Sequence, residues 1–330
     1  MEPLDQPASA ARLRQLAAAG LLSPPELERA LAHAGHLPTP RAWARFAGVA
    51  LLLAGAALCL AGVFFFFAYN WADLHRFAKF ALIQIALLAA AGYALWRGLD
   101  RLDGQVALFA ACALVGALLA VFGQVYQTGA DAYTLFLFWA TLIAVPTLLA
   151  RNAPLWMLFA VLLNLSLYYA QEQLIANFRD LRPAALFALN AGLLLVWELV
   201  RSRSEAWMRP PWYGRALLAL AAWWGTVLLL DAIDSRWITL DGTLPIWIAP
   251  LVALALGGLA AHHYLRRAPD LPAPSLLALC AIVIITAQIS QLIGWDNLFS
   301  FLFLGVLVLA QVAVATLLLL RAARRMGVPQ

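Results

Sequence analysis

Ten long apolar stretches follow one another along the chain, and they limit its possible folds more than any other feature of the sequence. A helix that crosses a membrane needs about 20 mostly apolar residues, because the hydrocarbon core of a bilayer is about 30 Å thick. The least separated pair, 133–150 and 154–171, is divided only by Arg151, Asn152 and Ala153. The predicted spans are residues 45–69, 77–96, 105–123, 133–150, 154–171, 183–200, 214–231, 245–265, 272–293 and 298–320.

The composition excludes the common classes of soluble protein. Of the 330 residues, 64% are hydrophobic and only 12% are charged, whereas a soluble domain has about 45–50% apolar and about 25% charged residues. So few charges cannot cover a water-facing surface, which argues against a soluble enzyme, a nucleic-acid-binding protein and a disordered regulator. The sequence therefore predicts an all-α fold, a polytopic bundle of about ten helices whose solvent is the lipid bilayer.

The distribution of basic residues predicts the orientation of these helices. Cytoplasmic loops of membrane proteins carry an excess of Lys and Arg. If the N-terminus is cytoplasmic, 17 of the 22 basic residues lie on the cytoplasmic side of the ten spans. We therefore expect a multi-pass protein of a bacterial inner membrane, with both termini in the cytoplasm.

The N-terminal segment differs from the rest of the chain because it is polar and has no apolar region typical of a signal peptide. Residues 9–19 predict a short helix that ends at Gly20, and Ser23-Pro24-Pro25-Glu26 is typical of a capping box that begins a second helix. The predicted domains are a cytoplasmic helical hairpin over residues 1–42 and a transmembrane bundle over residues 43–330.

Motifs of catalysis and cofactor binding are not found in the sequence. It has no phosphate-binding loop, no His-Glu-x-x-His pair, no nucleophile elbow and no Gly-rich dinucleotide turn. The three cysteines lie inside apolar stretches, without a spacing typical of metal ligands or of a disulfide framework. The sequence therefore predicts no catalytic residue, no metal and no cofactor, and it favours a non-enzymatic function.

Polar residues gather at the predicted outer ends of several spans, where polar groups commonly face a bundle interior or a watered cavity. Two glutamine pairs each share a helix face, because their members lie three residues apart. The candidate residues of an outward-opening polar pocket are Asn70, Trp71, Asp73, Lys79, Gln124, Tyr126, Gln127, Asp131, Gln288, Gln291, Asp296 and Asn297.

These residues have two interpretations. They can line a pocket for a headgroup, a sugar or a peptide, or they can form hydrogen bonds between helices that only fix the packing. Lys79 likewise can extend its ammonium group to the outer interface, or it can pair with Asp73, Asp131 or Asp296. Farther along the chain, we expect Glu198 to pair locally with Arg201 and Arg203.

The N-terminal part of the chain resembles a known bacterial family. The residues Phe-Phe-Ala-Tyr-Asn-Trp at 66–71, followed by Lys79-Phe80, look like the signature of domain-of-unknown-function family 2157. The stretch Gly123-Gln124-Val125-Tyr126-Gln127, followed by Leu137-Phe138-Trp139-Ala140 and Pro146, also fits that family. The resemblance covers roughly residues 10–150, so the bundle divides into a family-like part, 43–150, and remaining helices, 151–330.

The resemblance implies a membrane protein with partners but assigns no catalytic residue. Members of the family are described as predicted membrane proteins, and a small protein with a Gly-Asp-Tyr-x-x-Leu-x-Tyr motif often accompanies them. We therefore expect a membrane or periplasmic partner protein in addition to the lipid bilayer, and no nucleic acid.

Three functional hypotheses follow from these observations. The first is a non-enzymatic subunit or scaffold of a multi-component membrane system, which the companion protein favours. The second is a transporter or flippase whose polar pocket opens outward. The third is a membrane-embedded transferase that acts on a lipid-linked substrate, because such enzymes place an acidic residue in the first outer loop, where Asp73 lies.

Overall fold

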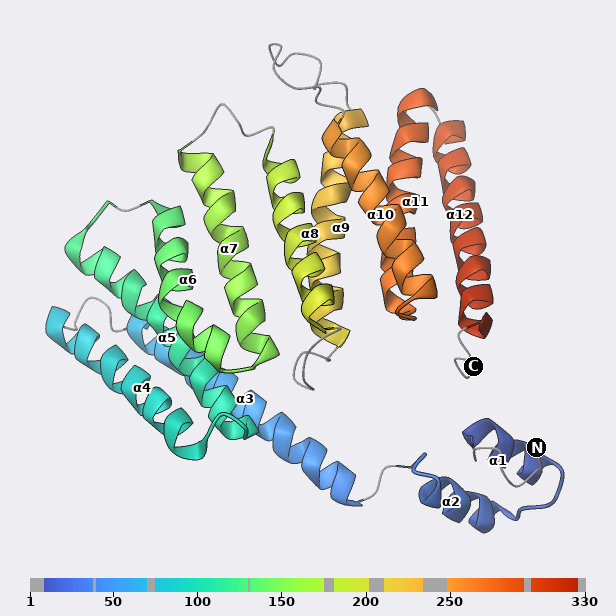
Figure 1. Cartoon of the computed structure of the whole chain (residues 1–330), viewed down its shortest axis with the longest axis horizontal. Coiled ribbons are helices and arrows are strands. Elements are labelled where there is room, and N and C mark those ends of the chain that lie inside the picture. Colours follow the sequence, from blue (N-terminus) through green and yellow to red (C-terminus); the bar gives the residue numbers. More distant parts are fainter. Residues whose placement is uncertain are drawn as a thin grey trace. The chain divides into compact units, whose positions relative to one another are not determined.

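The computed structural model describes residues 9–37, 40–69, 75–129, 131–174, 181–201, 211–233, 248–293 and 298–325. Within these residues the chain forms twelve α-helices and no strand (Figure 1). The helices are α1 (Ala10–Ala18), α2 (Pro24–His33), α3 (Pro40–Tyr69), α4 (Arg76–Arg97), α5 (Leu102–Tyr126), α6 (Ala132–Leu149), α7 (Ala153–Gln173), α8 (Arg182–Arg201), α9 (Pro211–Ile233), α10 (Ile248–Arg266), α11 (Pro272–Ile293) and α12 (Leu298–Arg325).

The ten helices α3–α12 are each long and apolar enough to cross a membrane. They coincide with the ten spans expected from the sequence, which confirms the all-α polytopic fold. The closely spaced helices α6 and α7 are separate, as predicted: α6 ends at Leu149, and α7 begins at Ala153 with Asn152 as its N-cap residue.

The chain divides into two compact units, residues 1–74 with 329–330 and residues 75–328. The first unit contains α1–α3, and the second contains α4–α12. The predicted division after residue 42, which separates a cytoplasmic hairpin from a transmembrane bundle, stays a prediction.

The helical hairpin of the first unit follows the sequence pattern closely. Gly20 takes a positive φ of 75° after α1, a backbone conformation that glycine adopts without a steric penalty. At the start of α2, the Ser23 backbone N–H and hydroxyl both donate to Glu26 Oε2, at 2.8 and 2.6 Å, and form the predicted capping box. Leu13 and Leu31 are the buried apolar side chains of α1 and α2 among the described residues.

The second unit is built from neighbouring helices that pack side by side in chain order. The closest pairs are α4 with α5, α6 with α7 and α8 with α9, and α9 also packs on α10 and α11 (Figure 1). Each core cluster joins three consecutive helices. The clusters include Cys112, Ile143 and Leu155 from α5–α7, Ala160, Trp197 and Leu217 from α7–α9, Phe187, Leu228 and Ala253 from α8–α10, and Leu218, Tyr264 and Ala273 from α9–α11.

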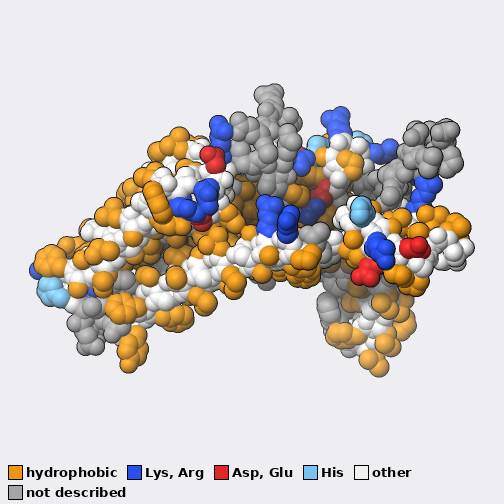
Figure 2. All heavy atoms as spheres, turned by 90° about the horizontal axis from the view of Figure 1, so that it is seen from below, with side chains coloured by type: hydrophobic (Ala, Val, Ile, Leu, Met, Phe, Trp, Pro, Cys, Tyr) orange, Lys and Arg blue, Asp and Glu red, His pale blue; other side chains and the backbone are white. Residues whose placement is uncertain are grey.

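The outward faces of these helices are apolar. Large hydrophobic side chains such as Leu95, Phe299 and Leu309 are exposed, and Figure 2 shows hydrophobic side chains along the helices with charged side chains in small groups. Exposed apolar patches of this extent are rare on soluble monomers. They suit a surface that faces lipid.

Candidate functional site

The polar residues predicted at the outer helix ends are only partly within the described residues. Five of the twelve candidates lie outside, namely Asn70, Trp71, Asp73, Asp296 and Asn297. Asp73, on which the transferase hypothesis depends, is one of these five. The remaining seven candidates belong to α4, α5, α6 and α11 or to residues that flank them.

The first turn of α4, which contains Lys79, lies beside the last turn of α5, which contains Tyr126. Lys79 occupies the first turn of α4 and is only 8% exposed. The next residue, Phe80, contacts Phe122 and Tyr126 of α5, with ring centroids 6.4 and 5.9 Å apart. The structure therefore joins the beginning of α4 to the end of α5, where Gln124 and Gln127 are exposed.

Gln288 and Gln291 lie elsewhere in the second unit. Both are exposed on α11, which packs against α9, α10 and α12. In Figure 1, α7, α8 and α9 stand between α5 and α11. Asp131 is the exposed N-cap residue of α6, and its backbone carbonyl accepts a hydrogen bond from the Thr134 hydroxyl at 2.6 Å. A pocket built from these residues stays a prediction.

A large apolar cavity lies between α8, α9, α10, α11 and α12, and nothing in the sequence pattern pointed to it. Its volume is about 2300 Å³. Small residues leave this space open, and they include Gly192 on α8, Gly257 on α10 and Ala281 on α11. A Cβ atom added at Gly192 or Gly257 would meet no other atom within 4 Å.

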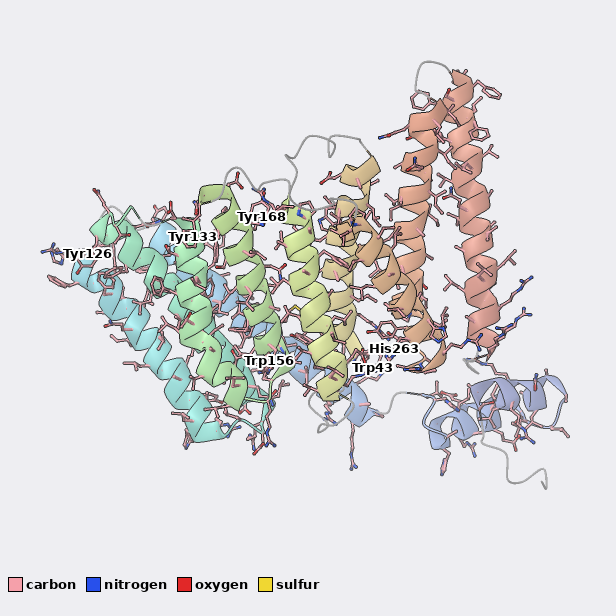
Figure 3. All side chains as sticks on the ribbon, turned by 45° about the horizontal axis from the view of Figure 1, so that its top comes forward. Trp43, Tyr126, Tyr133, Trp156, Tyr168 and His263 are labelled. Carbon is pink, nitrogen blue, oxygen red and sulfur yellow. The ribbon has the colours of Figure 1, made fainter. Side chains whose placement is uncertain are left out.

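The Glu, His and Arg side chains that line the cavity among the described residues all belong to one end of it, which we call the charged end. They come from the C-terminal ends of α8, α10 and α12 and from the residue after α10. In Figure 3, His263 lies at the same end of the second unit as Trp156, and Tyr126, Tyr133 and Tyr168 lie at the opposite end. The residues of the charged end are Glu198, His263, Arg266, Arg267, Arg321 and Arg325.

Glu198 is held from two helices. The Tyr264 hydroxyl of α10 donates to Glu198 Oε1 at 2.7 Å, and Arg201 Nη2 lies 3.1 Å from Glu198 Oε2. His263 Nε2 lies 3.6 Å from the same Oε2 atom. The predicted local pairing with Arg201 is confirmed, and Arg203 lies outside the described residues. The contacts with α10 were missed, because sequence spacing gives no sign of them.

A second ion pair fixes the helices beside Glu198. Arg215 of α9 makes a bidentate contact with Asp270, which lies between α10 and α11, at 2.6 and 3.0 Å. Paired N–H groups of a guanidinium match the two oxygens of a carboxylate, so the geometry of such a pair is well defined. This pair ties the connection between α10 and α11 to α9 and helps to position the charged end.

The four arginines of the charged end differ from Arg201 and Arg215, each of which pairs with a carboxylate. Arg266, Arg267, Arg321 and Arg325 are exposed, and no acidic side chain within the described ranges forms an ion pair with any of them. Because Glu198 already accepts from Tyr264 and pairs with Arg201, the charged end carries excess positive charge.

Gln311 of α12 adds a polar group to the apolar wall. Its Oε1 atom accepts from the Thr286 hydroxyl of α11 at 3.2 Å. Its Nε2 atom is buried and has no hydrogen-bond partner among the described residues. Gln311 is ten residues from Arg321, which corresponds to about 15 Å along a helix, so this amide lies well away from the charged end.

Two asparagines join α7 to α8, and their positions inside apolar spans could have revealed them in the sequence. Asn190 Nδ2 donates to Asn164 Oδ1 at 2.7 Å, and Asn164 Nδ2 donates to Asn190 Oδ1 at 3.1 Å. Each Nδ2 group also donates to the backbone carbonyl four residues earlier. Both amides are thus fully used as donors, and their role is to fix packing.

The C-terminal end of α7 and the N-terminal end of α8 carry a further polar contact that the sequence does not reveal. Arg182 lies 4.4 Å from the ring centroid of Tyr168, and its Nη2 atom is 3.5 Å from Glu172 Oε2. Nearby, Gln173 Oε1 accepts from the backbone N–H of Tyr133 at 3.2 Å and joins α7 to α6. These contacts lie far along α8 from Glu198 and do not line the cavity.

Comparison with known proteins supports the membrane assignment. No curated protein and no solved structure is found to be similar to the chain. The matched family segment, which extends from α1 to the first turn of α7, does not include the cavity. With ten apolar helices, the chain is a multi-pass membrane protein. Residues 14–156 match the family described as "Predicted membrane protein (DUF2157)", which confirms the family resemblance over that segment.

Proposed function

We propose that the protein accommodates a membrane lipid in the cavity between α8 and α12 and acts as a lipid transporter or flippase. One observation carries the proposal: the cavity wall is apolar, and its charged side chains all lie at one end. A lipid has the same division between apolar chains and a polar headgroup. Apolar side chains and lipid chains can therefore pack together while the headgroup stays beside charged groups.

The size of the cavity favours a lipid over a small metabolite. Pockets for small molecules usually have volumes of about 300–1,000 Å³, and this open cavity has a volume of about 2300 Å³. Few polar groups line the wall away from the charged end, whereas sites for sugars and amino acids need several hydrogen-bond partners. The bilayer supplies lipid at high concentration, so such a space in a membrane protein does not remain empty.

The orientation of the chain adds a direction to the proposal. By the excess of basic residues, the charged end faces the cytoplasm of a bacterial inner membrane, and both termini lie on that side. The lipid would then enter from the cytoplasmic leaflet. Gln288 and Gln291, in the last turns of α11, would lie toward the other end of the route.

Blocking the cavity tests the proposal. The double variant Gly192→Phe/Gly257→Phe fills the space from α8 and α10, where added side chains have room. Gly305→Phe on α12 is the matched control, because Gly305 also has open space but does not line the cavity. Native mass spectrometry of protein released from nanodiscs should find bound lipid on the wild type and the control, and none on the double variant.

Transport needs its own readout. In vesicles, exchange of a fluorescent phospholipid between leaflets should be fast with the wild-type protein and the Gly305→Phe control. It should fall to the protein-free rate with the double variant. Equal lipid retention in the double variant and the control would contradict lipid binding in the cavity, and unchanged leaflet exchange would contradict transport.

A second candidate function is a subunit or scaffold of a membrane complex. The division of the chain into two compact units, of which residues 1–74 belong to the first, favours it. Within α1 and α2, only Leu13 and Leu31 are buried among the described apolar residues, so the hairpin is too small to be stable by itself. If the hairpin binds a partner, deleting residues 9–37 should abolish its co-purification, and Lys79→Ala should not. Unchanged co-purification after the deletion would contradict this function.

A further inference from the structure

We propose that the lipid held in the cavity is an anionic glycerophospholipid, whose phosphate the arginines of α10 and α12 recognise. This inference rests on the proposed function, and it adds the chemical class of the lipid. It is carried by the placement of Arg266, Arg267, Arg321 and Arg325 where the apolar wall ends. Glu198 is the only acidic side chain that lines the cavity among the described residues.

The two helix ends supply these arginines in pairs. Arg321 and Arg325 lie four residues apart, so they share one face of α12. Arg266 is the last residue of α10, and Arg267 follows it directly. Guanidinium groups bind phosphate oxygens through two parallel N–H bonds. A phosphate diester at the charged end can therefore receive donors from the arginines of α10 or of α12, which all line the cavity.

Glu198 does not offset this positive charge. Its two oxygens already have partners, because Tyr264 donates to Oε1 and Arg201 lies 3.1 Å from Oε2. A zwitterionic headgroup carries an ammonium group as well as a phosphate. That ammonium would meet the excess positive charge, and the described residues that line the cavity offer it no free carboxylate. The charged end therefore disfavours an ethanolamine headgroup and favours a headgroup with net negative charge.

The chain offers a matched control for this selectivity. Arg324 and Arg325 are adjacent on α12 and both are exposed, but only Arg325 lines the cavity. Arg325→Gln and Arg324→Gln remove the same charge from the same helix end. A lipid that is only attracted to the general surface potential would respond equally to both substitutions, whereas a lipid bound in the cavity would respond to Arg325→Gln alone.

The experiment uses the full chain in nanodiscs made of equal parts phosphatidylglycerol, phosphatidylethanolamine and diacylglycerol with identical acyl chains. Native mass spectrometry measures which lipid remains bound. We expect phosphatidylglycerol to exceed phosphatidylethanolamine on the wild type and on Arg324→Gln. Arg325→Gln should lower that ratio about fivefold, since one arginine near an anionic headgroup contributes about that factor, and Arg321→Gln/Arg325→Gln should lower it further.

Three outcomes would contradict either the anionic preference, the cavity as the place of binding, or lipid binding itself. Equal retention of all three lipids would overturn the anionic preference, while the proposed lipid binding would stand. Equal loss of phosphatidylglycerol in Arg324→Gln and Arg325→Gln would show that surface charge, not the cavity, attracts the lipid. Absence of retained lipid on the wild type would overturn the proposed function itself.

Discussion

Tyr264 on α10 donates its hydroxyl hydrogen to Glu198 Oε1 on α8, and the two oxygens lie 2.7 Å apart. This bond joins two walls of the cavity at its charged end. Arg201 contacts the other carboxylate oxygen at 3.1 Å. The bond therefore fixes the spacing of α8 and α10, and it also occupies the only carboxylate that lines the cavity among the described residues.

Removing the Tyr264 hydroxyl should make the second unit less stable to unfolding. Tyr264→Phe keeps the ring but leaves Glu198 without one partner, so the free energy of unfolding should fall by about 1.5–3 kcal/mol, the usual contribution of a hydrogen bond to a charged group. Tyr126→Phe is the control, because the Tyr126 hydroxyl is exposed and has no hydrogen bond within the described residues. Unfolding in mixed micelles measures both, and equal stability of the two variants would contradict the role of this bond.

Substitutions at Asn164 and Asn190 should have strongly non-additive effects on the free energy of unfolding. Asn190 is fully buried, and its replacement by leucine leaves the Asn164 amide without its partner on α8. Hydrogen bonds between membrane helices contribute about 0.6 kcal/mol on average and up to about 1.7 kcal/mol, so Asn190→Leu should cost about 1 kcal/mol. Asn164→Leu/Asn190→Leu should cost no more than either single change, because no unpaired amide remains. Additive losses in this double-mutant cycle would show that the amides act independently.

Gly116 on α5 should not tolerate even a methyl group. The Trp139 indole donates to the Cys112 carbonyl at 2.8 Å, which holds the ring over Gly116, and an added Cβ would lie 2.5 Å from ring atoms. Alanine gains about 1 kcal/mol in helix propensity, but overpacking costs about 1–3 kcal/mol. We expect Gly116→Ala to be destabilising and Gly92→Ala on α4, which has open space, to be neutral or stabilising. Thermal unfolding followed by tryptophan fluorescence compares them.

The capping box of α2 predicts a dependence on pH. The side-chain and backbone hydrogen bonds from Ser23 hold the pKa of Glu26 below its ordinary value of 4.5. The folded state thus binds a proton less readily than the unfolded state, so Glu26 stabilises α2 above pH 4.5, and this contribution is lost as the pH falls through the lowered pKa. Hydrogen exchange in the full chain should show that Glu26→Ala removes this acid-induced loss of protection in α2. Glu28→Ala should leave it intact, and the reverse result would contradict the capping role.

The fold was predictable because membrane helices are specified locally. A run of about 20 apolar residues has few stable alternatives to a spanning helix, since its backbone polar groups must bond within the segment. For this reason even the three residues 150–152 suffice to separate α6 from α7. The capping box at Ser23 and Glu26 was equally local, and it was confirmed.

The cavity was not predictable, because it depends on the separation of five helices that no local pattern records. In the sequence, the arginines at 266, 267, 321 and 325 only indicate the cytoplasmic side, and no pattern there places them around one opening. Glu198 was expected to pair within its own helix, whereas Tyr264, 66 residues later, is its second partner. Asn164 and Asn190 could have been noticed, since amides inside apolar spans usually bind a neighbouring helix.

The most direct test of lipid binding in the cavity is an experimental structure of the full chain in nanodiscs that contain phosphatidylglycerol. The account predicts elongated lipid density along α8 and α10, with its headgroup beside Arg266 and Arg325. It also predicts that the Tyr264–Glu198 bond persists beside that density. If α8–α12 instead close against one another and leave no space for a lipid chain, the central claim is contradicted.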